Sequence, residues 1–175
     1  MQVTISANGK NIKAEISEEQ AKILGLVEDK PKTGYESLGT GETYYLVDVD
    51  DEITTMKYDS RLDRDCYDVG NYYSDKVIAE NNARADRLLR QLRQWQALND
   101  KPISVEDWNN ESKKKWFIIY SSEEMYAEYY YIMRLPNTIY FTTKEKAEEA
   151  IEVFRDELLW YFTEYVQRLD EVQNG

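Results

Sequence analysis

The sequence predicts an α+β fold made of two imperfectly repeated β-β-(β)-α units, preceded by a small ββα segment. Three observations support this prediction. Short stretches of alternating apolar residues end in turn residues, and the alternation changes to a helical period after each group of strands. Hydrophobic residues make up 42% of the chain and charged residues 32%, which is typical of a folded protein. With 175 residues, the chain is long enough to bury a core as one domain or two small ones.

Residues 1–27 are expected to form a ββα module. Asn8-Gly9 favours the positive φ values of a type I′ hairpin turn. Ser17 and Gln20 have the spacing of a capping box, and Gly25 is the expected residue after the helix. The core of such a module is very small, so we expect it to lean on the rest of the chain or to be loosely tethered. The alternating apolar residues are Val3, Ile5, Ile12, Ala14 and Ile16.

Residues 28–42 contain proline, glycine and charge without an apolar period, which predicts a linker. The first unit then covers 43–100. Strands are expected over 44–49 and 53–58, joined by an acidic turn and followed by an acidic loop. After a short segment at 69–73, Ser74 is the expected N-cap of a long helix. Its apolar face would contain Val77, Ile78, Ala85, Leu88, Leu89, Leu92 and Trp95.

The second unit covers 101–175 and repeats this order. Strands are expected over 116–120 and 125–133, with a short strand at 139–141. Thr142 to Glu145 form a capping box, which opens a second long helix reaching Leu169. Aligning the units places Tyr72–Lys76 over Tyr140–Lys144 and Tyr44–Val47 over Trp116–Ile119. Duplication would let both units share one antiparallel sheet backed by two helices, although β-β-α order also arises by coincidence.

Several short motifs stand out along the chain: Gly34-Tyr35-Glu36, Gly41 to Tyr45, Gly70 to Tyr73, Asp107-Trp108-Asn109, Lys115-Trp116 and Thr138 to Ala147. These motifs resemble a widespread group of small accessory proteins carried by phages and prophages of Gram-positive bacteria. The resemblance covers about residues 11–165. The chain departs from the group at Tyr73, where members usually have Phe, and at Lys76–Ala79.

This resemblance implies a phage or mobile-element origin. Many small acidic accessory proteins of this kind act against host defence systems, as anti-CRISPR and anti-restriction proteins do. The motifs indicate no catalytic chemistry, so the implied activity rests on analogy.

Negative charge is concentrated in parts of the chain. The 22 Lys+Arg and 34 Asp+Glu residues give a net charge of −12. Residues 42–68 have a net charge of −6 and residues 102–175 of −7, whereas residues 69–101 have +2. A chain this acidic is a poor binder of nucleic acid. The acidic residues could be a solvated rim, or they could imitate phosphates and contact a basic partner surface.

The predicted partner-binding residues lie in the acidic turns of both units and in the tyrosine-rich strand. Tyrosine is common at protein–protein interfaces, but these residues are also consistent with a hydrophobic core whose edge is exposed to water. A calcium loop at 48–59 is disfavoured, because Ile53 stands where glycine is needed and Asp59 where glutamate is needed. The set is Asp48, Asp50, Asp51, Glu52, Asp63, Asp65, Asp68, Glu123, Glu124, Glu128, Tyr126 and Tyr130.

Arginines recur along one stripe of the first long helix, at Arg84, Arg87, Arg90 and Arg93. This stripe could contact nucleic acid or partner carboxylates, but we favour pairing with the chain's own acidic loop. With no histidine and the single cysteine Cys66, the chain excludes Ser/His/Asp and Cys/His catalysis and any disulfide within the chain. A site of paired carboxylates stays open, but no pair is singled out. We therefore expect no enzyme, no cofactor and no metal.

Together these observations predict a phage-encoded, non-enzymatic inhibitor of a host defence complex, such as a CRISPR effector or a restriction enzyme. It would cover a basic nucleic-acid-binding surface and would not bind nucleic acid itself. The alternative is a structural or assembly protein that forms a homo-oligomer, such as a homodimer, through tyrosine-rich faces. Neither a signal peptide nor an apolar run of membrane-spanning length is visible, so we expect the cytoplasm of the bacterial host.

Overall fold

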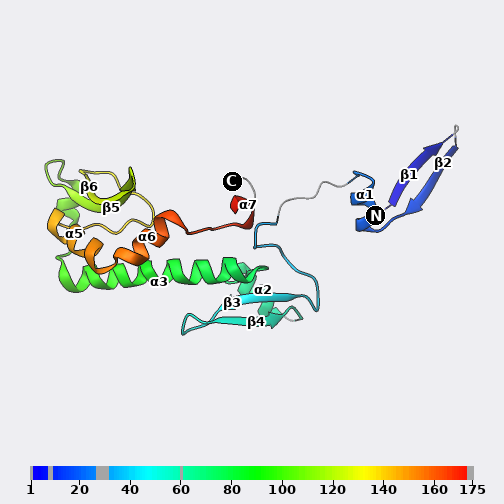
Figure 1. The fold of residues 1–175 in the computed structure, drawn as a ribbon, viewed down its shortest axis with the longest axis horizontal. Coiled ribbons are helices and arrows are strands. Elements are labelled where there is room, and N and C mark those ends of the chain that lie inside the picture. The colour runs from blue at the N-terminus through cyan, green and yellow to red at the C-terminus, as the bar shows by residue number, and fades with distance from the viewer. Residues whose placement is uncertain (1, 8–9, 27–31, 60, 173–175) are drawn as a thin grey trace. The chain divides into compact units, whose positions relative to one another are not determined.

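The computed structural model describes residues 2–7, 10–26, 32–59 and 61–172, and these form an α+β structure (Figure 1). The predicted fold class is confirmed. The described strands form three separate two-stranded antiparallel sheets, so the two repeats do not share one sheet. The chain divides into two compact units, residues 1–33 and 34–175, each described by itself. The predicted turn at Asn8-Gly9 and residues 28–31 of the predicted linker lie outside the described residues.

The first compact unit is the expected ββα module. Strands β1 (Gln2–Ala7) and β2 (Lys10–Glu15) pair antiparallel, with Gln2 opposite Glu15. Helix α1 (Glu18–Ile23) begins at the predicted capping box. The Gln20 amide donates to Ser17 Oγ at 3.1 Å, and the Ser17 amide donates to Gln20 Oε1 at 3.0 Å. Gly25 follows the helix with φ +64°, in the left-handed region that glycine tolerates best.

The first repeat contains the predicted hairpin and helix. Strands β3 (Thr43–Val47) and β4 (Ile53–Lys57) form the hairpin, and α3 (Lys76–Asn99) is the long helix. The predicted acidic loop is instead partly helical, as α2 (Arg61–Asp68). The N-cap of α3 is Asp75 rather than Ser74, because Asp75 Oδ1 accepts from the amides of Val77 at 2.8 Å and Ile78 at 3.1 Å.

The second repeat begins with a short helix, α4 (Val105–Asn109), followed by strands β5 (Lys115–Ser121) and β6 (Glu124–Tyr130). The second long helix is kinked into α5 (Lys144–Val153) and α6 (Arg155–Thr163), and a last turn, α7, covers Leu169–Val172. At Phe154 the backbone leaves helical geometry with ψ +20°. Its amide still donates to Ala150 O at 3.0 Å, and its carbonyl still accepts from Leu158 at 2.8 Å.

The same construction recurs in both repeats. In each repeat, a residue that follows the hairpin in the sequence forms an isolated β-bridge with the first strand of that hairpin. Tyr73 pairs with Tyr45, and Phe141 pairs with Trp116. The bridging residue is followed by a hydroxyl that bonds an upstream acidic side chain. Ser74 bonds Glu36, and Thr142 bonds Asp100. The two segments predicted to be duplicated therefore share this pattern of contacts, and the duplication itself stays a prediction.

The bridges also correct the alignment of the repeats by one residue. Because Tyr45 and Trp116 hold equivalent bridges, Tyr45 corresponds to Trp116 and Tyr44 corresponds to Lys115. A shift of one residue in a strand reverses which face each side chain occupies. The corrected pair is consistent, since Tyr44 and Lys115 are each only 1% exposed.

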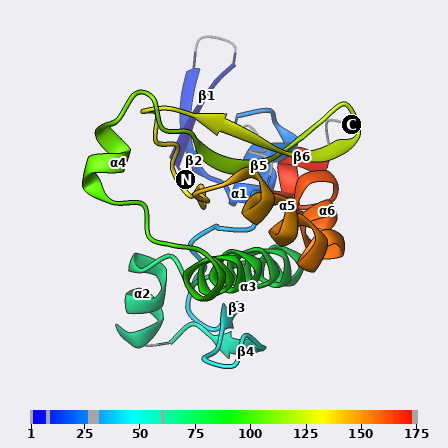
Figure 2. The same ribbon diagram turned by 90° about the vertical axis from the view of Figure 1, so that its left-hand side faces the viewer.

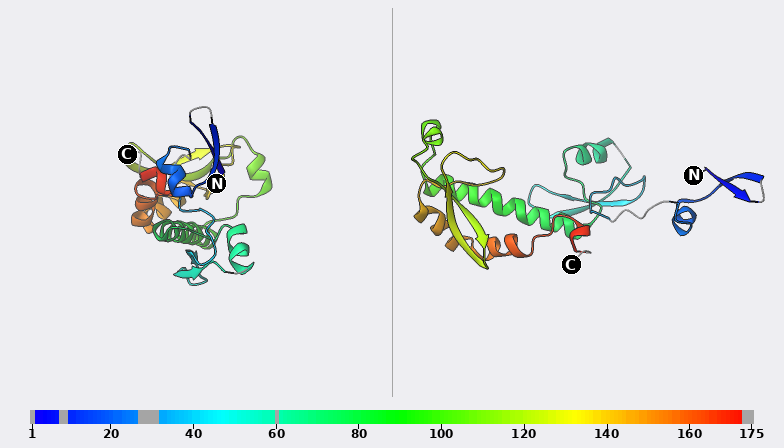
Figure 3. Two further views of the ribbon diagram at one scale, coloured as in Figure 1. Left: turned by 90° about the vertical axis from the view of Figure 1, so that its right-hand side faces the viewer. Right: turned by 90° about the horizontal axis from the view of Figure 1, so that it is seen from above.

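Helix α3 lies between the β3–β4 hairpin and the β5–β6 hairpin (Figure 2). Its N-terminal part contributes Ile78 and Ala79 to a cluster with Tyr73, and its C-terminal part contributes Leu88 and Leu92 to a larger core under β5, β6, α5 and α6. Viewed from above, α3 runs from the β3–β4 hairpin to the second repeat (Figure 3). No helix in the described part of the chain is long and apolar enough to cross a bilayer.

Two segments outside the first repeat pack on it. The carbonyl of Gly34, in the predicted linker, accepts from the Ser74 amide at 2.8 Å. Gly34 has φ +93°, and a Cβ there would lie 2.7 Å from Ile78 Cγ1, so only glycine fits without rearrangement. At the other end, Val166 and Leu169 pack on the cluster around Ile78. The predicted helix reaching Leu169 is therefore wrong, because α6 ends at Thr163 and the chain returns to α3.

Candidate protein-binding surface

The turn between β3 and β4 is acidic, and one of its carboxylates is used inside the molecule. Asp51 has a φ of +66°, in the left-handed region of the backbone. Its carboxylate pairs with Arg87 Nε at 3.2 Å and with the Arg90 guanidinium. The Arg90 hydrogen bond is the main cause that holds the pKa of Asp51 below its usual value. Asp51 therefore fastens the hairpin to the helix and is not available to a partner.

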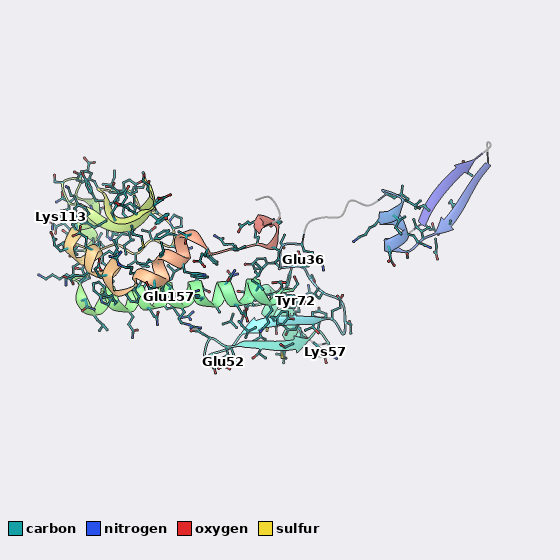
Figure 4. The ribbon with its side chains drawn as sticks, viewed as in Figure 1. Glu36, Glu52, Lys57, Tyr72, Lys113 and Glu157 are labelled. Atoms are coloured by element: carbon teal, nitrogen blue, oxygen red, sulfur yellow. The ribbon has the colours of Figure 1, made fainter. Side chains whose placement is uncertain are left out.

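The other three acidic residues of this turn face solvent. Asp48, Asp50 and Glu52 are exposed, and Figure 4 shows Glu52 at the end of the hairpin. The Asp48 carboxylate accepts from the Val49 amide at 2.7 Å, so it also shapes the turn. In the part of the chain that the structure describes, no ion pair involves these three side chains.

Asp63 does not belong to this surface, contrary to the prediction. It is 2% exposed, on the inner side of α2. The Tyr44 hydroxyl donates to Asp63 Oδ1 at 2.6 Å, and the Asp59 amide donates to Oδ2 at 2.8 Å. Burial of a carboxylate is tolerated because it receives these hydrogen bonds. Asp65 and Asp68, on the same helix, are exposed as expected.

The β5–β6 hairpin ends in a two-residue turn of unusual sequence. Ser121 and Glu124 face each other across the hairpin, and Ser122 and Glu123 between them have φ values of +54° and +66°. Two positive φ values define a type I′ turn, which normally contains Asn-Gly or Asp-Gly. A glutamate there costs about 1 kcal/mol of backbone strain. Glu123 and Glu124 are both exposed.

The remaining predicted residues lie along β6. Tyr126 is 41% exposed, which suits a contact surface. Tyr130 is half-buried, and its ring stacks on Phe117 with centroids 5.0 Å apart, so it is mainly a core residue. The Glu128 carboxylate is partly buried and accepts from the Tyr129 amide at 2.9 Å. Of the second set, Glu123, Glu124 and Tyr126 therefore face solvent most clearly.

The basic stripe of α3 is largely neutralised within the chain. Arg84 forms a bidentate pair with Glu157 of α6, with distances of 2.9 and 3.0 Å, and its guanidinium lies 4.0 Å from the Trp160 ring centroid. Arg87 and Arg90 pair with Asp51, as the preferred interpretation of the stripe predicted. Glu157 and Trp160 were not anticipated, because their approach to α3 depends on the kink at Phe154.

Two further features were missed from the sequence. A groove of about 510 Å³ lies beside α5 and β6 and contains Glu145, Glu148, Glu149 and Glu152. Three of these pair with cations of the same stretch, namely Lys144, Lys146 and Arg155, so their field is partly cancelled. The sequence signal for this groove was the spacing of the four glutamates, which places them opposite the apolar face of the helix.

The second missed feature is the buried lysine of the second repeat. Lys115 Nζ donates to the carbonyl of Asn110 at 3.0 Å and to that of Tyr131, and it lies 5.8 Å from the Trp108 ring centroid. Burial lowers the pKa of Lys115. Three consecutive lysines precede Trp116, and no local pattern of residues distinguishes the one that is buried.

Within the described ranges, no three carboxylate or thiol groups come together in a way that could hold a metal ion. What the hairpin ends offer is exposed negative charge at two places on a rigid scaffold. No model of a known protein family matches the chain, and neither a curated protein nor a solved structure shows significant similarity to it.

The strain at Glu123 leads to a prediction about stability. Replacing Glu123 with glycine is expected to stabilise the protein by roughly 0.5–1 kcal/mol, because glycine adopts a positive φ without penalty. Chemical denaturation measures this directly. The matched control is Glu124→Gly, one residue later in β6, where glycine is expected to destabilise by a similar amount. A loss of stability in Glu123→Gly would contradict a strained turn.

Proposed function

We propose that this protein is a phage-encoded, non-enzymatic inhibitor of a host defence complex in the bacterial cytoplasm. It binds a basic, nucleic-acid-binding surface of that complex through its acidic hairpin turns. The contact residues are Asp48, Asp50 and Glu52 in the first repeat and Glu123, Glu124 and Tyr126 in the second. Asp65 and Asp68 extend the acidic surface along α2.

The position of Glu123 carries this proposal. A charged side chain occupies a left-handed turn position where glycine or asparagine would be more stable. Backbone strain of this kind clusters at functional sites, since function tolerates a local loss of stability. The exposed Glu124 beside it doubles the negative charge at the end of the hairpin.

Internal pairing of the arginines supports the same assignment. Arg84, Arg87 and Arg90 are engaged with Glu157 and Asp51, so the stripe is screened from an acidic ligand such as nucleic acid. The exposed carboxylates of the turns are left to interact outward. Charge complementarity of this type speeds association and selects a basic partner.

A competition experiment tests the proposal. DNA binding by a purified CRISPR effector and by a purified restriction enzyme is measured by gel shift while this protein is added. We expect release of DNA from one of them at low salt and weaker release between 50 and 200 mM salt, because exposed charges are screened. The double variant Glu123→Lys with Glu124→Lys is expected to inhibit about tenfold less.

The control is a second double variant that makes the same change in net charge at a different place on the surface. Glu106→Lys with Glu111→Lys also reverses two exposed glutamates, near α4, and is expected to inhibit like the wild type. Equal inhibition by both double variants, or inhibition that is insensitive to salt, would overturn binding through the turns. Light scattering on the same samples detects a homodimer formed through the tyrosine-rich strand.

A further inference from the structure

A cavity of about 180 Å³ lies between α3, β5, α6 and the segment 136–139. Asn137 and Thr138 belong to this segment and are polar, but most of the wall is aliphatic or aromatic. The residues that define it are Leu88, Leu92, Ile118, Phe141, Leu158 and Phe162.

This cavity is a partly open, mainly apolar hollow. Its volume of about 180 Å³ corresponds to about six water molecules at ~30 Å³ each. Water is a poor occupant, because each buried molecule needs two to four polar partners and the wall offers few. An apolar molecule would recover the dispersion contacts that an empty cavity forfeits.

Hydrogen bonds hold the chain just before the segment 136–139. The Leu135 amide donates to the Tyr140 hydroxyl at 2.7 Å, and that hydroxyl donates to Met133 O at 3.3 Å. Tyr140 is itself buried against Trp108 and Phe117. The connection that leads into the segment 136–139 is therefore fixed before any ligand arrives.

An entry path exists on the side of α6. The cavity is only partly enclosed, and Phe162 in its wall is 37% exposed. Leu89, Ile139 and Tyr161 are half-buried at the same cavity. An apolar molecule can reach the interior by passing side chains of the surface, without unfolding of a helix.

We infer that this cavity is a binding site for a small, uncharged, apolar molecule with a single ring. Its volume exceeds the ~150 Å³ of an engineered apolar cavity that binds benzene, and it is below the ~300 Å³ of sites for larger ligands. A charged group is excluded, because no ionisable side chain of opposite charge lies in the wall. This site is separate from the acidic turns and does not depend on the function proposed for them.

Toluene is the probe, added to the full-length protein with labelled methyl groups. We expect saturable shifts of the Ile118, Leu88 and Leu158 methyl resonances below the aqueous solubility of toluene. The Tm is expected to rise by roughly 3–6 °C at ten times the Kd. Benzoate, which has the same ring with a charge, is expected to cause neither change.

Two filling variants connect binding to this cavity. Leu89→Trp and Ile139→Phe add volume at half-buried wall positions and are expected to weaken toluene binding at least tenfold, while circular dichroism shows whether each is folded. Toluene shifts confined to residues outside the wall, or unchanged binding in a folded filling variant, would overturn the inference. So would the absence of any shift in the wild type at saturating toluene.

Discussion

Replacing Phe141 with alanine is expected to destabilise the protein by about 3–5 kcal/mol. Phe141 is fully buried, and its ring packs 6.1 Å from that of Trp95 in the core shared by α3, α5 and α6. Its backbone also joins the hairpin, since the Phe141 amide donates to Trp116 O at 2.7 Å. Truncation would leave a void beside the existing cavity. We expect the Tm to fall by roughly 10 °C in a thermal melt.

Phe162→Ala is the matched control for this variant. It removes the same side chain from a position that is 37% exposed and is expected to cost about 1 kcal/mol. Equal losses in the two variants would mean that Phe141 is not part of a tightly packed core. Far-UV circular dichroism at low temperature establishes that both variants retain their helices.

The second large effect is expected at alkaline pH. Burial raises the pKa of Tyr73 to about 12 and also raises those of Tyr44 and Tyr165. In the unfolded chain each titrates near pH 10. A group whose pKa is higher in the folded state contributes its full stabilisation of the folded protein at pH values below its unfolded pKa. This stabilisation is lost as the pH rises from about 10 through 12. Tyr73 alone accounts for about 3 kcal/mol, so unfolding in this window should be cooperative.

Absorbance at 295 nm and circular dichroism, followed together, measure this transition. We expect exposed tyrosines to ionise near pH 10 and a second, steeper step to coincide with loss of helix. Lys115 has the opposite effect on stability. Burial lowers its pKa, and the free-energy cost of burying its charged form is relieved as the pH rises. Tyr73→Phe should move the step to higher pH. A single tyrosine titration at pH 10 with the helices intact would contradict buried phenols.

Local patterns predicted the elements of the fold well. The capping box at Ser17, the cap before α5 and the two hairpins all depend on residues close together in the sequence. Long-range contacts decided the rest. The β-bridges at Tyr73 and Phe141 set the one-residue shift in the alignment of the two repeats. Packing of Val166 on the cluster around Ile78 sets where α6 ends. Neither contact has a local signature.

For the candidate surface, charge type was predictable and burial was not. Asp51, Asp63 and Glu52 look alike in the sequence, yet one pairs with arginines, one is buried under Tyr44 and one is exposed. Their fates depend on which face of a turn or helix meets α3. The strain at Glu123 was also hidden, because only the register of the hairpin shows that its turn has two residues.

Helix α3 sets a fixed distance and angle between the two hairpins. From Ile78, in the first core, to Leu92, in the second, it advances about 21 Å at ~1.5 Å per residue. Each residue also turns the helix by about 100°, so length and rotation cannot change independently. The helix therefore holds the cores of the two repeats at a set separation and rotation, and the β3–β4 turn is fastened to it at Arg87 and Arg90.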